Sequence, residues 1–231
     1  MASVASIPAP TARHKLLRLE PGDHLTRTEF ERRYAAMPAS VKAELIEGVV
    51  HIPSPVRITK HGKQHGWIMA WLGTYQAETP STESADNSTI RLDLENEPQP
   101  DGLLRIVEER GGQSRIDEDG YVVAAPELVV EVASSSASYD VHEKKRVYRR
   151  NGVREYLVWL VDDKRIEWWE LVEGEFLSLP ADERGVVRSR IFPGLWLDTS
   201  ALLDGDLAQV LKTVRSGTKS VEHAEFVGRL A

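Results

Sequence analysis

The chain has 231 residues, of which 41% are hydrophobic and 28% are charged. This composition is sufficient for a buried core and excludes both wholesale disorder and collagen-like repeats. The sequence contains no cysteine, which excludes disulfide bonds, thiolate nucleophiles and cysteine-bound metal centres. The formal net charge of −7 gives no overall attraction to nucleic acid, so any polyanion site would have to be a local patch.

The N-terminal residues 1–12 are rich in Ala, Ser and Pro and lack the basic and apolar segments of a secretory signal. No apolar run approaches the length of about 18 residues that a membrane-spanning helix needs. We therefore expect a cytoplasmic protein without a membrane partner. The expected division is a loose tail over 1–25, one domain over 26–200, and a C-terminal helix and tail over 201–231.

The first third of the chain is expected to form two helices with a β-hairpin between them. An acidic first turn and an i, i+4 aromatic pair indicate a helix over 26–37. Two apolar runs around Gly48 predict a hairpin over 42–52. A second helix is predicted over 61–75, because large apolar side chains recur at helical spacing: Ile68, Trp71, Leu72 and Tyr75.

The middle of the chain is expected to alternate strands and loops. Loops are predicted over 79–87 and 108–119, which are polar or charged. Strands are predicted over 89–94, 100–107, 121–124 and 127–133. The last of these is Val-rich, as is typical of a central strand. Period-two alternation places on one of its faces Glu127, Val129, Glu131 and Ala133.

The remaining third continues the mixed pattern. After a small-residue turn over 134–138, we expect a helix over 139–151 that ends at Gly152. The elements predicted after it are a strand over 154–161, a hairpin over 165–179 around Gly174, a strand region over 186–197, a helix over 202–214 and a polar tail. This order predicts an α/β or α+β domain with one mixed sheet.

Two carboxylates are the first candidates for chemistry. Asp101 follows a proline at the start of a predicted strand, and Glu131 lies within an otherwise Leu/Val strand. A buried carboxylate without a partner is costly, so Glu131 needs a cation, a hydrogen-bond donor or an exposed edge. The pattern alone favours an ion-paired or partly solvated Glu131, with a functional carboxylate as the alternative.

Cations gather on the predicted helix that follows: Lys144, Lys145, Arg146, Arg149 and Arg150. For most of them a solvated helix face is the ordinary interpretation. A tight turn would nevertheless bring this helix near the two carboxylates, and the combined set suits phosphodiester hydrolysis. Carboxylates can hold Mg²⁺, a lysine can stabilise developing negative charge, and arginines can bind backbone phosphates.

Other candidate groups are weaker. His61 and His65 are separated by four residues on a predicted helix, but no third ligand is evident, so we expect partly buried polar residues or a flank of the site. No GxSxG, P-loop or GxGxxG motif occurs in the sequence. The pair Trp168-Trp169 is better explained by hairpin packing than by base stacking. The role of Glu47 is left open.

Five motifs occur in one order: Glu44-Leu-Ile-Glu-Gly48, Pro100-Asp101, Pro126-Glu-Leu-Val-Val-Glu-Val-Ala-Ser134, Lys144-x3-Tyr148 and Gly152-Val-Arg-Glu-Tyr156. The series resembles the Uma-two (Uma2) family of restriction-endonuclease-like proteins, within the PD-(D/E)XK nuclease superfamily, over about residues 26–200. The resemblance implies a restriction-endonuclease-like core, with a mixed central sheet flanked by helices.

The resemblance also implies roles for single residues. Asp101 matches the acid of the PD element, and Glu131 matches the acid of the (D/E)XK element. Position 133 is Ala where the superfamily has Lys, and Lys144 on the next helix matches the displaced lysine, with Lys145 as the fallback. The early acidic position is assigned to Glu44 rather than Glu47, because Glu47 lies at the hairpin turn.

The function implied by this resemblance is a Mg²⁺- or Mn²⁺-dependent endonuclease that cleaves DNA with a metal-activated water. Asp101 and Glu131 would hold the metal, Lys144 would position the nucleophile, and Glu44 would assist. Backbone phosphates would contact Lys145, Arg146, Arg149 and Arg150, and a homodimer would cut both strands. The alternative is a catalytically inactive nuclease fold that binds nucleic acid or protein, which Ala133 and the net charge favour. A hydrolase for another phosphate ester is the third interpretation.

Overall fold

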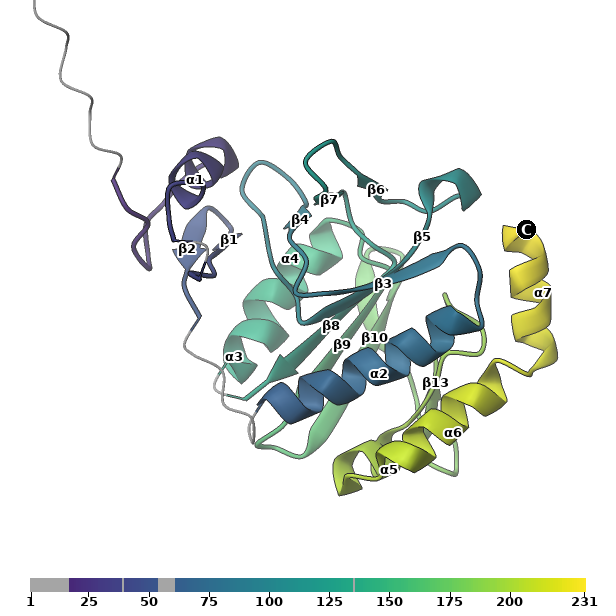
Figure 1. The fold of residues 1–231 in the computed structure, drawn as a ribbon. Coiled ribbons are helices and arrows are strands. Elements are labelled where there is room, and N and C mark those ends of the chain that lie inside the picture. Colours follow the sequence, from purple (N-terminus) through teal and green to yellow (C-terminus); the bar gives the residue numbers. More distant parts are fainter. Residues whose placement is uncertain (1–16, 39, 54–60, 135) are drawn as a thin grey trace, which may run out of the picture.

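The computed structural model describes residues 17–38, 40–53, 61–134 and 136–231, so most of the expected tail over 1–25 and part of the turn over 134–138 lie outside the described residues. A six-stranded sheet forms the centre, in the order β11-β10-β9-β8-β5-β3 (Figure 1). Within this sheet β8 and β9 are parallel, and the other neighbouring strands are antiparallel. The strands are β3 (Thr82–Asp86), β5 (Gly102–Ile106), β8 (Leu128–Ala133), β9 (Glu155–Leu160), β10 (Arg165–Val172) and β11 (Glu175–Ser178). The mixed sheet predicted from the sequence is confirmed.

Strand β8 is buried along its whole length, as its Val-rich sequence predicts. Its side chains alternate between two hydrophobic clusters on opposite faces of the sheet. Leu128, Val130 and Val132 belong to one cluster, and Val129 and Ala133 belong to the other. The predicted alternation is therefore confirmed, and it places Glu131 on the same face as Val129.

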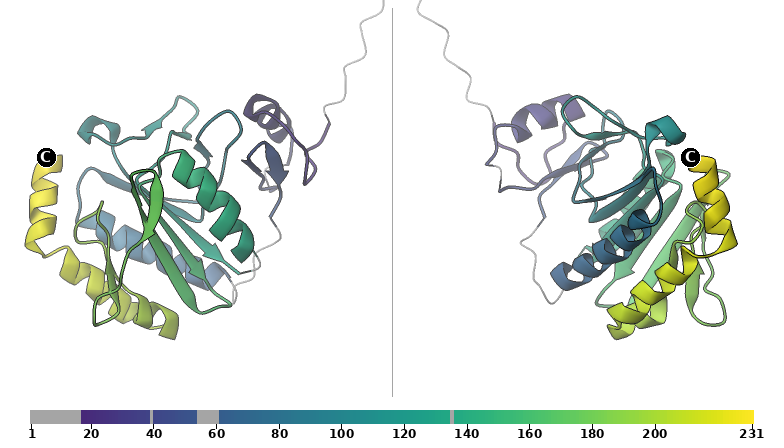
Figure 2. Two further views of the ribbon diagram at one scale, coloured as in Figure 1. Left: turned by 180° about the vertical axis from the view of Figure 1, so that it is seen from behind. Right: turned by 45° about the vertical axis from the view of Figure 1, so that its right-hand side comes forward.

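Helices cover both faces of the sheet, as the two views in Figure 2 show. Four helices lie on the face of Val130: α2 (Lys63–Ala77), α5 (Thr199–Asp204), α6 (Leu207–Gly217) and α7 (Val221–Leu230). The predicted stripe of α2 is buried as expected. The opposite face carries α3 (Ala137–Tyr139), the π-helical turn η3 (Asp140–Lys144) and α4 (Lys145–Arg150), which together connect β8 to β9. Gly152 follows α4 with a φ of 83°, as expected for a helix-ending glycine.

A small N-terminal unit packs beside the sheet. It contains α1 (Arg27–Tyr34) and the hairpin β1 (Glu44–Ile46) and β2 (Val49–His51), around a third cluster that includes Phe30, Leu45 and Val50. Positive φ angles at Glu47 and Gly48, 50° and 74°, make the two-residue turn that the sequence predicts. Leu45 forms a β-bridge with Glu97. This bridge ties the hairpin that carries Glu44 to the segment that leads into β5.

Two predictions for the middle of the chain were wrong. Residues 82–86 of the expected loop form β3, which lies at the edge of the sheet and pairs with β5. The other side of this edge strand has no neighbouring strand in the sheet, so polar residues are tolerated there. The strand expected over 89–94 is reduced to β4 (Ile90–Arg91), because the Asp93 side chain accepts from the backbone N–H of Glu95 and turns the chain. β4 joins β6 (Arg115–Ile116) and β7 (Val122–Val123) in a small sheet, and η2 (Glu108–Arg110) lies in the expected 108–119 loop.

The C-terminal third also differs from expectation. The strand region over 186–197 is a hairpin of β12 (Val186–Arg188) and β13 (Trp196–Asp198). The helix expected over 202–214 is broken at Gly205, whose φ is 86°, and restarts where the Asp206 side chain caps α6. The expected polar tail contains α7, which buries Phe226 and Leu230. None of the helices in the described ranges has both the length and the apolar content needed to cross a bilayer.

Candidate active site

A buried lysine lies between two carboxylates at one end of the sheet. The Nζ atom of Lys144 is 2.9 Å from Oε1 of Glu131 and 3.0 Å from Oε1 of Glu44. All three side chains are less than a tenth exposed. The structure therefore brings together three of the four residues assigned to catalysis from the sequence.

Three separate elements supply these groups. Glu131 projects from β8, Glu44 begins β1, and Lys144 ends the π-helical turn η3. The wider turn of a π-helix changes the direction in which the following side chains point, and such turns occur often at functional sites. Here the turn directs Lys144 inward, while the next residue, Lys145, places its amine 3.5 Å from the ring centre of Trp169.

Two further residues complete this cluster: Tyr148, which the motif Lys144-x3-Tyr148 already relates to the lysine, and Asp140, which the sequence did not single out. Oδ1 of Asp140 lies 3.7 Å from the Lys144 amine. The Tyr148 hydroxyl donates a hydrogen bond of 3.0 Å to Oε1 of Glu131. Both lie four residues from Lys144, on the same side of the helical segment, so helical spacing was the signal that could have identified them. We call Glu44, Glu131, Asp140, Lys144 and Tyr148 the lysine cluster.

Burial and mutual charge shift the pKa values of the lysine cluster. Burial raises the pKa of Glu131 well above its usual value, and the nearby carboxylates reinforce this against the attraction of Lys144. Burial also raises the pKa of Asp140, to about 6. For Lys144 burial acts in the opposite direction, but the carboxylates of Glu131, Glu44 and Asp140 outweigh it and raise the pKa well above its usual value. The surrounding carboxylates therefore favour the charged form of Lys144.

Asp101 lies at the start of β5, next to the lysine cluster. Gly102 pairs with Val130 across the antiparallel strands, so continuing the register by one residue places Asp101 opposite Glu131. Its Oδ2 accepts a hydrogen bond of 2.7 Å from the backbone N–H of Val132, and its Oδ1 is 2.9 Å from Nε2 of His61. Burial acts most strongly on the Asp101 carboxyl and would raise its pKa, but His61, Val132 and Lys144 together hold the pKa below its usual value.

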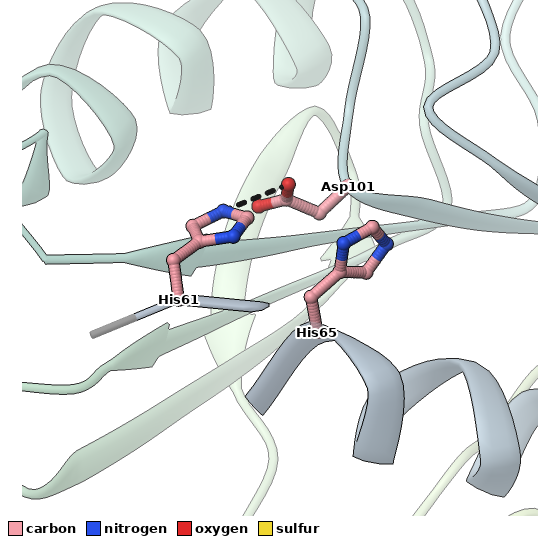
Figure 3. A group of neighbouring side chains, drawn as sticks. All are labelled: His61, His65 and Asp101. Atoms are coloured by element: carbon pink, nitrogen blue, oxygen red, sulfur yellow. Dashed lines mark ion pairs between the residues drawn. The ribbon is translucent and has the colours of Figure 1, made fainter. Parts of the chain in front are cut away.

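His61 and His65 converge on Asp101 from the start of α2, as Figure 3 shows. One ligand atom from each of the three residues lies within 4.8 Å of the other two. The hydrogen bond with Asp101 raises the pKa of His61 above its usual value. The sequence pattern showed no third partner for these histidines because Asp101 lies far along the chain, and the packing of α2 against β5 brings it to the start of α2.

The basic residues of α4 all have partners within the protein. Arg146 and Arg150 form ion pairs with Glu47, and Arg149 pairs with Glu175. The Arg146 and Arg150 side chains are still about half exposed, at 52% and 50%. Glu47 therefore contacts the outer surface of α4 and lies outside the lysine cluster, in agreement with the preference for Glu44.

The residues at this end of the sheet are of the types that can hold a divalent cation. Asp101 and Glu131 offer carboxylate oxygens, the ligand type that Mg²⁺ and Mn²⁺ prefer. The end of the sheet gathers four carboxyl groups, from Glu44, Asp101, Glu131 and Asp140, around the single ammonium of Lys144. Within the described part of the chain, Nδ1 of His61 is buried and has no hydrogen-bond partner, which leaves a nitrogen lone pair or proton uncompensated beside Asp101.

Comparisons with known proteins agree with this architecture. Residues 27–200 match the family model described as "Uma2: Putative restriction endonuclease". The chain is similar to a crystal structure from Anabaena variabilis ATCC 29413, described as a "putative nuclease belonging to DUF820", with 16% identity and a TM-score of 0.55 over 78% of this chain and 97% of that chain. At this identity the likeness shows a shared fold. No curated protein matches the chain. Because the family model covers three quarters of the sequence, the chain belongs to the Uma2 family of restriction-endonuclease-like proteins.

Proposed function

We propose that the protein is a Mg²⁺- or Mn²⁺-dependent endonuclease that hydrolyses DNA phosphodiester bonds. The observation that carries this proposal is the position of the Lys144 amine, which lies 2.9 Å from Glu131 on β8. Asp101 lies opposite Glu131, one residue beyond the last pair of β5 and β8. Two acids and one amine thus meet at the same end of the sheet, which is the arrangement that metal-assisted phosphodiester hydrolysis requires.

Each residue has a separate role in this proposal. Asp101 and Glu131 would hold the cation, which when bound would polarise the phosphate and lower the pKa of water. Lys144 would orient the nucleophile and stabilise negative charge that develops on the phosphate. Glu44 accepts a hydrogen bond of 2.7 Å from the backbone N–H of Gln99 and is 3.0 Å from the Lys144 amine, so it would position that amine.

DNA would approach over α4. Arg146 and Arg150 are exposed, and Arg149 is partly exposed. All three take part in surface ion pairs, which are worth about 1 kcal/mol or less, so phosphates can compete for them. Arg146 and Arg150 adjoin the hairpin that carries Glu44, so backbone phosphates bound there would lie beside the lysine cluster.

A second candidate is a catalytically inactive module that keeps the fold and binds nucleic acid or protein. Two observations favour it. Position 133 is Ala, and the Lys144 amine is already engaged by carboxylates of the same chain. A buried, fully paired lysine can serve stability alone. The two candidates differ in whether a divalent cation binds in a manner that depends on Asp101 and Glu131.

The test is nicking of supercoiled plasmid with Mg²⁺ or Mn²⁺, by the wild type and by Asp101→Asn, Glu131→Gln and Lys144→Met. We expect at least a hundredfold loss of nicking in each variant. Glu29→Gln is the matched control, because it makes the same change of charge at ion pairs on α1 whose partners belong neither to the lysine cluster nor to α4. Equal nicking by all five proteins would identify a contaminating nuclease and end the proposal. Thermal unfolding of each variant separates loss of chemistry from loss of fold.

A further inference from the structure

Two imidazole rings at the N-terminal end of α2 face the carboxylate of Asp101. His61 and His65 lie one helical turn apart, with their ring centres 5.6 Å from each other and their planes at 74°. One ligand atom from each of the three residues lies within 4.8 Å of the others. Ligands of one first-row metal ion, at bond lengths of about 2.0–2.2 Å, lie within roughly 4.4 Å of each other, so small rotations of the side chains would close the shell.

These side chains are partly shielded from solvent. The exposed fractions of His61, His65 and Asp101 are 21%, 15% and 13%. Among the described residues, Nδ1 of His61 has no hydrogen-bond partner although it is buried. A buried ring nitrogen without a partner requires an explanation, and a bound cation provides one.

A further carboxylate, that of Asp86, lies beside His65 on the side away from Asp101. Oδ1 of Asp86, on the edge strand β3, lies 2.9 Å from Nε2 of His65, at an angle outside hydrogen-bond range. In Figure 3 the other ring nitrogen, Nδ1, is on the side of the ring that faces His61 and Asp101. Histidines that bind metals usually donate the N–H of their second nitrogen to a carboxylate or carbonyl, which fixes the tautomer and the ring orientation, and a small rotation of the Asp86 side chain would complete such a bond here.

We propose that His61, His65 and Asp101 bind one divalent transition-metal ion, with Asp86 as the outer carboxylate that orients His65. Imidazole is a ligand for ions such as Mn²⁺, Co²⁺ and Zn²⁺, whereas Mg²⁺ prefers oxygen ligands and keeps much of its water. The inference rests on the proposed function through Asp101, which belongs to both ligand sets. The ion at this site would share Asp101 with the proposed catalytic cation, and its other two ligands would be imidazole nitrogens.

The test is equilibrium binding of Co²⁺ and Mg²⁺ to the full chain, prepared without a histidine tag. Calorimetry gives affinity and stoichiometry, and the visible absorption of Co²⁺ reports nitrogen ligands. We expect one Co²⁺ per chain, bound at least tenfold more tightly than Mg²⁺. His65→Gln should weaken Co²⁺ binding by at least about tenfold, and Asp86→Asn, which leaves the three ligands in place, by about tenfold.

The matched control is His142→Gln, which removes an exposed histidine outside the three-residue group. It should leave Co²⁺ binding unchanged. Co²⁺ bound equally by wild type and His65→Gln, or Mg²⁺ bound as tightly as Co²⁺ by the wild type, would overturn the inference. Asp86→Asn provides a second measurement if His65→Gln does not fold.

The failure of this inference and the failure of the proposed function give different results. Glu131→Gln leaves His61, His65 and Asp101 intact, so it should retain Co²⁺ binding within about threefold even where nicking is lost. Co²⁺ binding without any metal-dependent nicking would support the metal site and contradict the nuclease. Nicking that needs Glu131 but is insensitive to His65→Gln, without preferential Co²⁺ binding, would support the nuclease and contradict this site.

Discussion

Glu44 and Lys144 are separated by 100 positions in the sequence, and their charged groups lie 3.0 Å apart in the buried part of the molecule. The contact ties the N-terminal hairpin to the π-helical turn after β8. Removing one member of a buried ion pair leaves the other charges without compensation, which is more costly than removing the whole pair. The free energy of unfolding is therefore expected to depend on this contact and on the charged groups around it.

Lys144→Met should destabilise the protein strongly, because Glu44, Glu131 and Asp140 would share a buried space without a cation. The expected loss in the free energy of unfolding is about 3–5 kcal/mol, measured by urea denaturation at pH 7. Lys145→Met is the control, since Lys145 contacts Trp169 at a partly exposed position and should cost about 1 kcal/mol. Adding Glu131→Gln to Lys144→Met should restore part of the stability. Equal losses for the two lysine variants would contradict a structural role for the lysine cluster.

Glu155 should make stability depend on pH. Burial raises its pKa from 4.5 to about 7, against hydrogen bonds from Ser189 and the backbone of Arg190 and Ile191. Its folded pKa lies above its unfolded pKa, so the folded state binds more protons between these values and stability falls as pH rises from 4.5 to 7. The fall should be on the order of 3 kcal/mol and should level off above pH 7.

The measurement for Glu155 is urea denaturation at several pH values between 5 and 8, for the wild type and Glu155→Gln. Other buried acids, among them Asp140, contribute slopes of the same sign. The difference between the two proteins therefore isolates Glu155. A parallel pH dependence of the two unfolding free energies would show that this carboxyl does not titrate in the range.

Gly48→Ala should weaken the hairpin that carries Glu44. Gly48 has a φ of 74°, and an added Cβ would lie 3.3 Å from the backbone oxygen of Leu25. The left-handed conformation alone costs a non-glycine residue about 1–2 kcal/mol, and the close contact adds to this. Gly73→Ala in α2 is the control: its Cβ would meet open space, so we expect a gain of about 0.5–1 kcal/mol. Thermal unfolding distinguishes the two by the sign of the change.

The double variant Arg146→Gln, Arg150→Gln should weaken binding to duplex DNA and make it less sensitive to salt. If each arginine contacts one phosphate, the slope of log affinity against log salt concentration should decrease by about 2. Fluorescence anisotropy at several salt concentrations with Ca²⁺ in place of the active metal gives this slope. The control is Lys212→Gln, Arg215→Gln, which removes two exposed charges from α6. An equal change of slope in both double variants would indicate nonspecific attraction.

Regular patterns allowed much of the fold to be predicted from the sequence. The period-two alternation of β8, the four-residue stripe of α2 and the turn at Glu47-Gly48 are local signals, and all three appear as expected. The strand β3 was missed because an edge strand of polar residues lacks the apolar alternation that identifies a strand. The helix α7 was missed because its two buried apolar residues, Phe226 and Leu230, are too few to form a clear stripe.

The candidate site was predictable only in part. The motif order indicated Asp101, Glu131, Lys144 and Glu44, and the structure brings Lys144 into contact with both glutamates. Asp140 and the grouping of His61 with Asp101 were not predicted. The first depends on the π-helical turn, which no local propensity specifies, and the second depends on the packing of α2 against β5, which are distant in the sequence.

The packing of α6 on α2 has a consequence for synthesis on the ribosome. Val210 and Val214 of α6 belong to the same hydrophobic cluster as Ile68 and Trp71 of α2, so the helix that begins beside His61 and His65 is covered by residues that are translated well after it. Because translation proceeds from the N-terminus, a nascent polypeptide lacks this cover until α6 has emerged. The helix that carries His65 therefore gains its full apolar cover only after α6 has been synthesised.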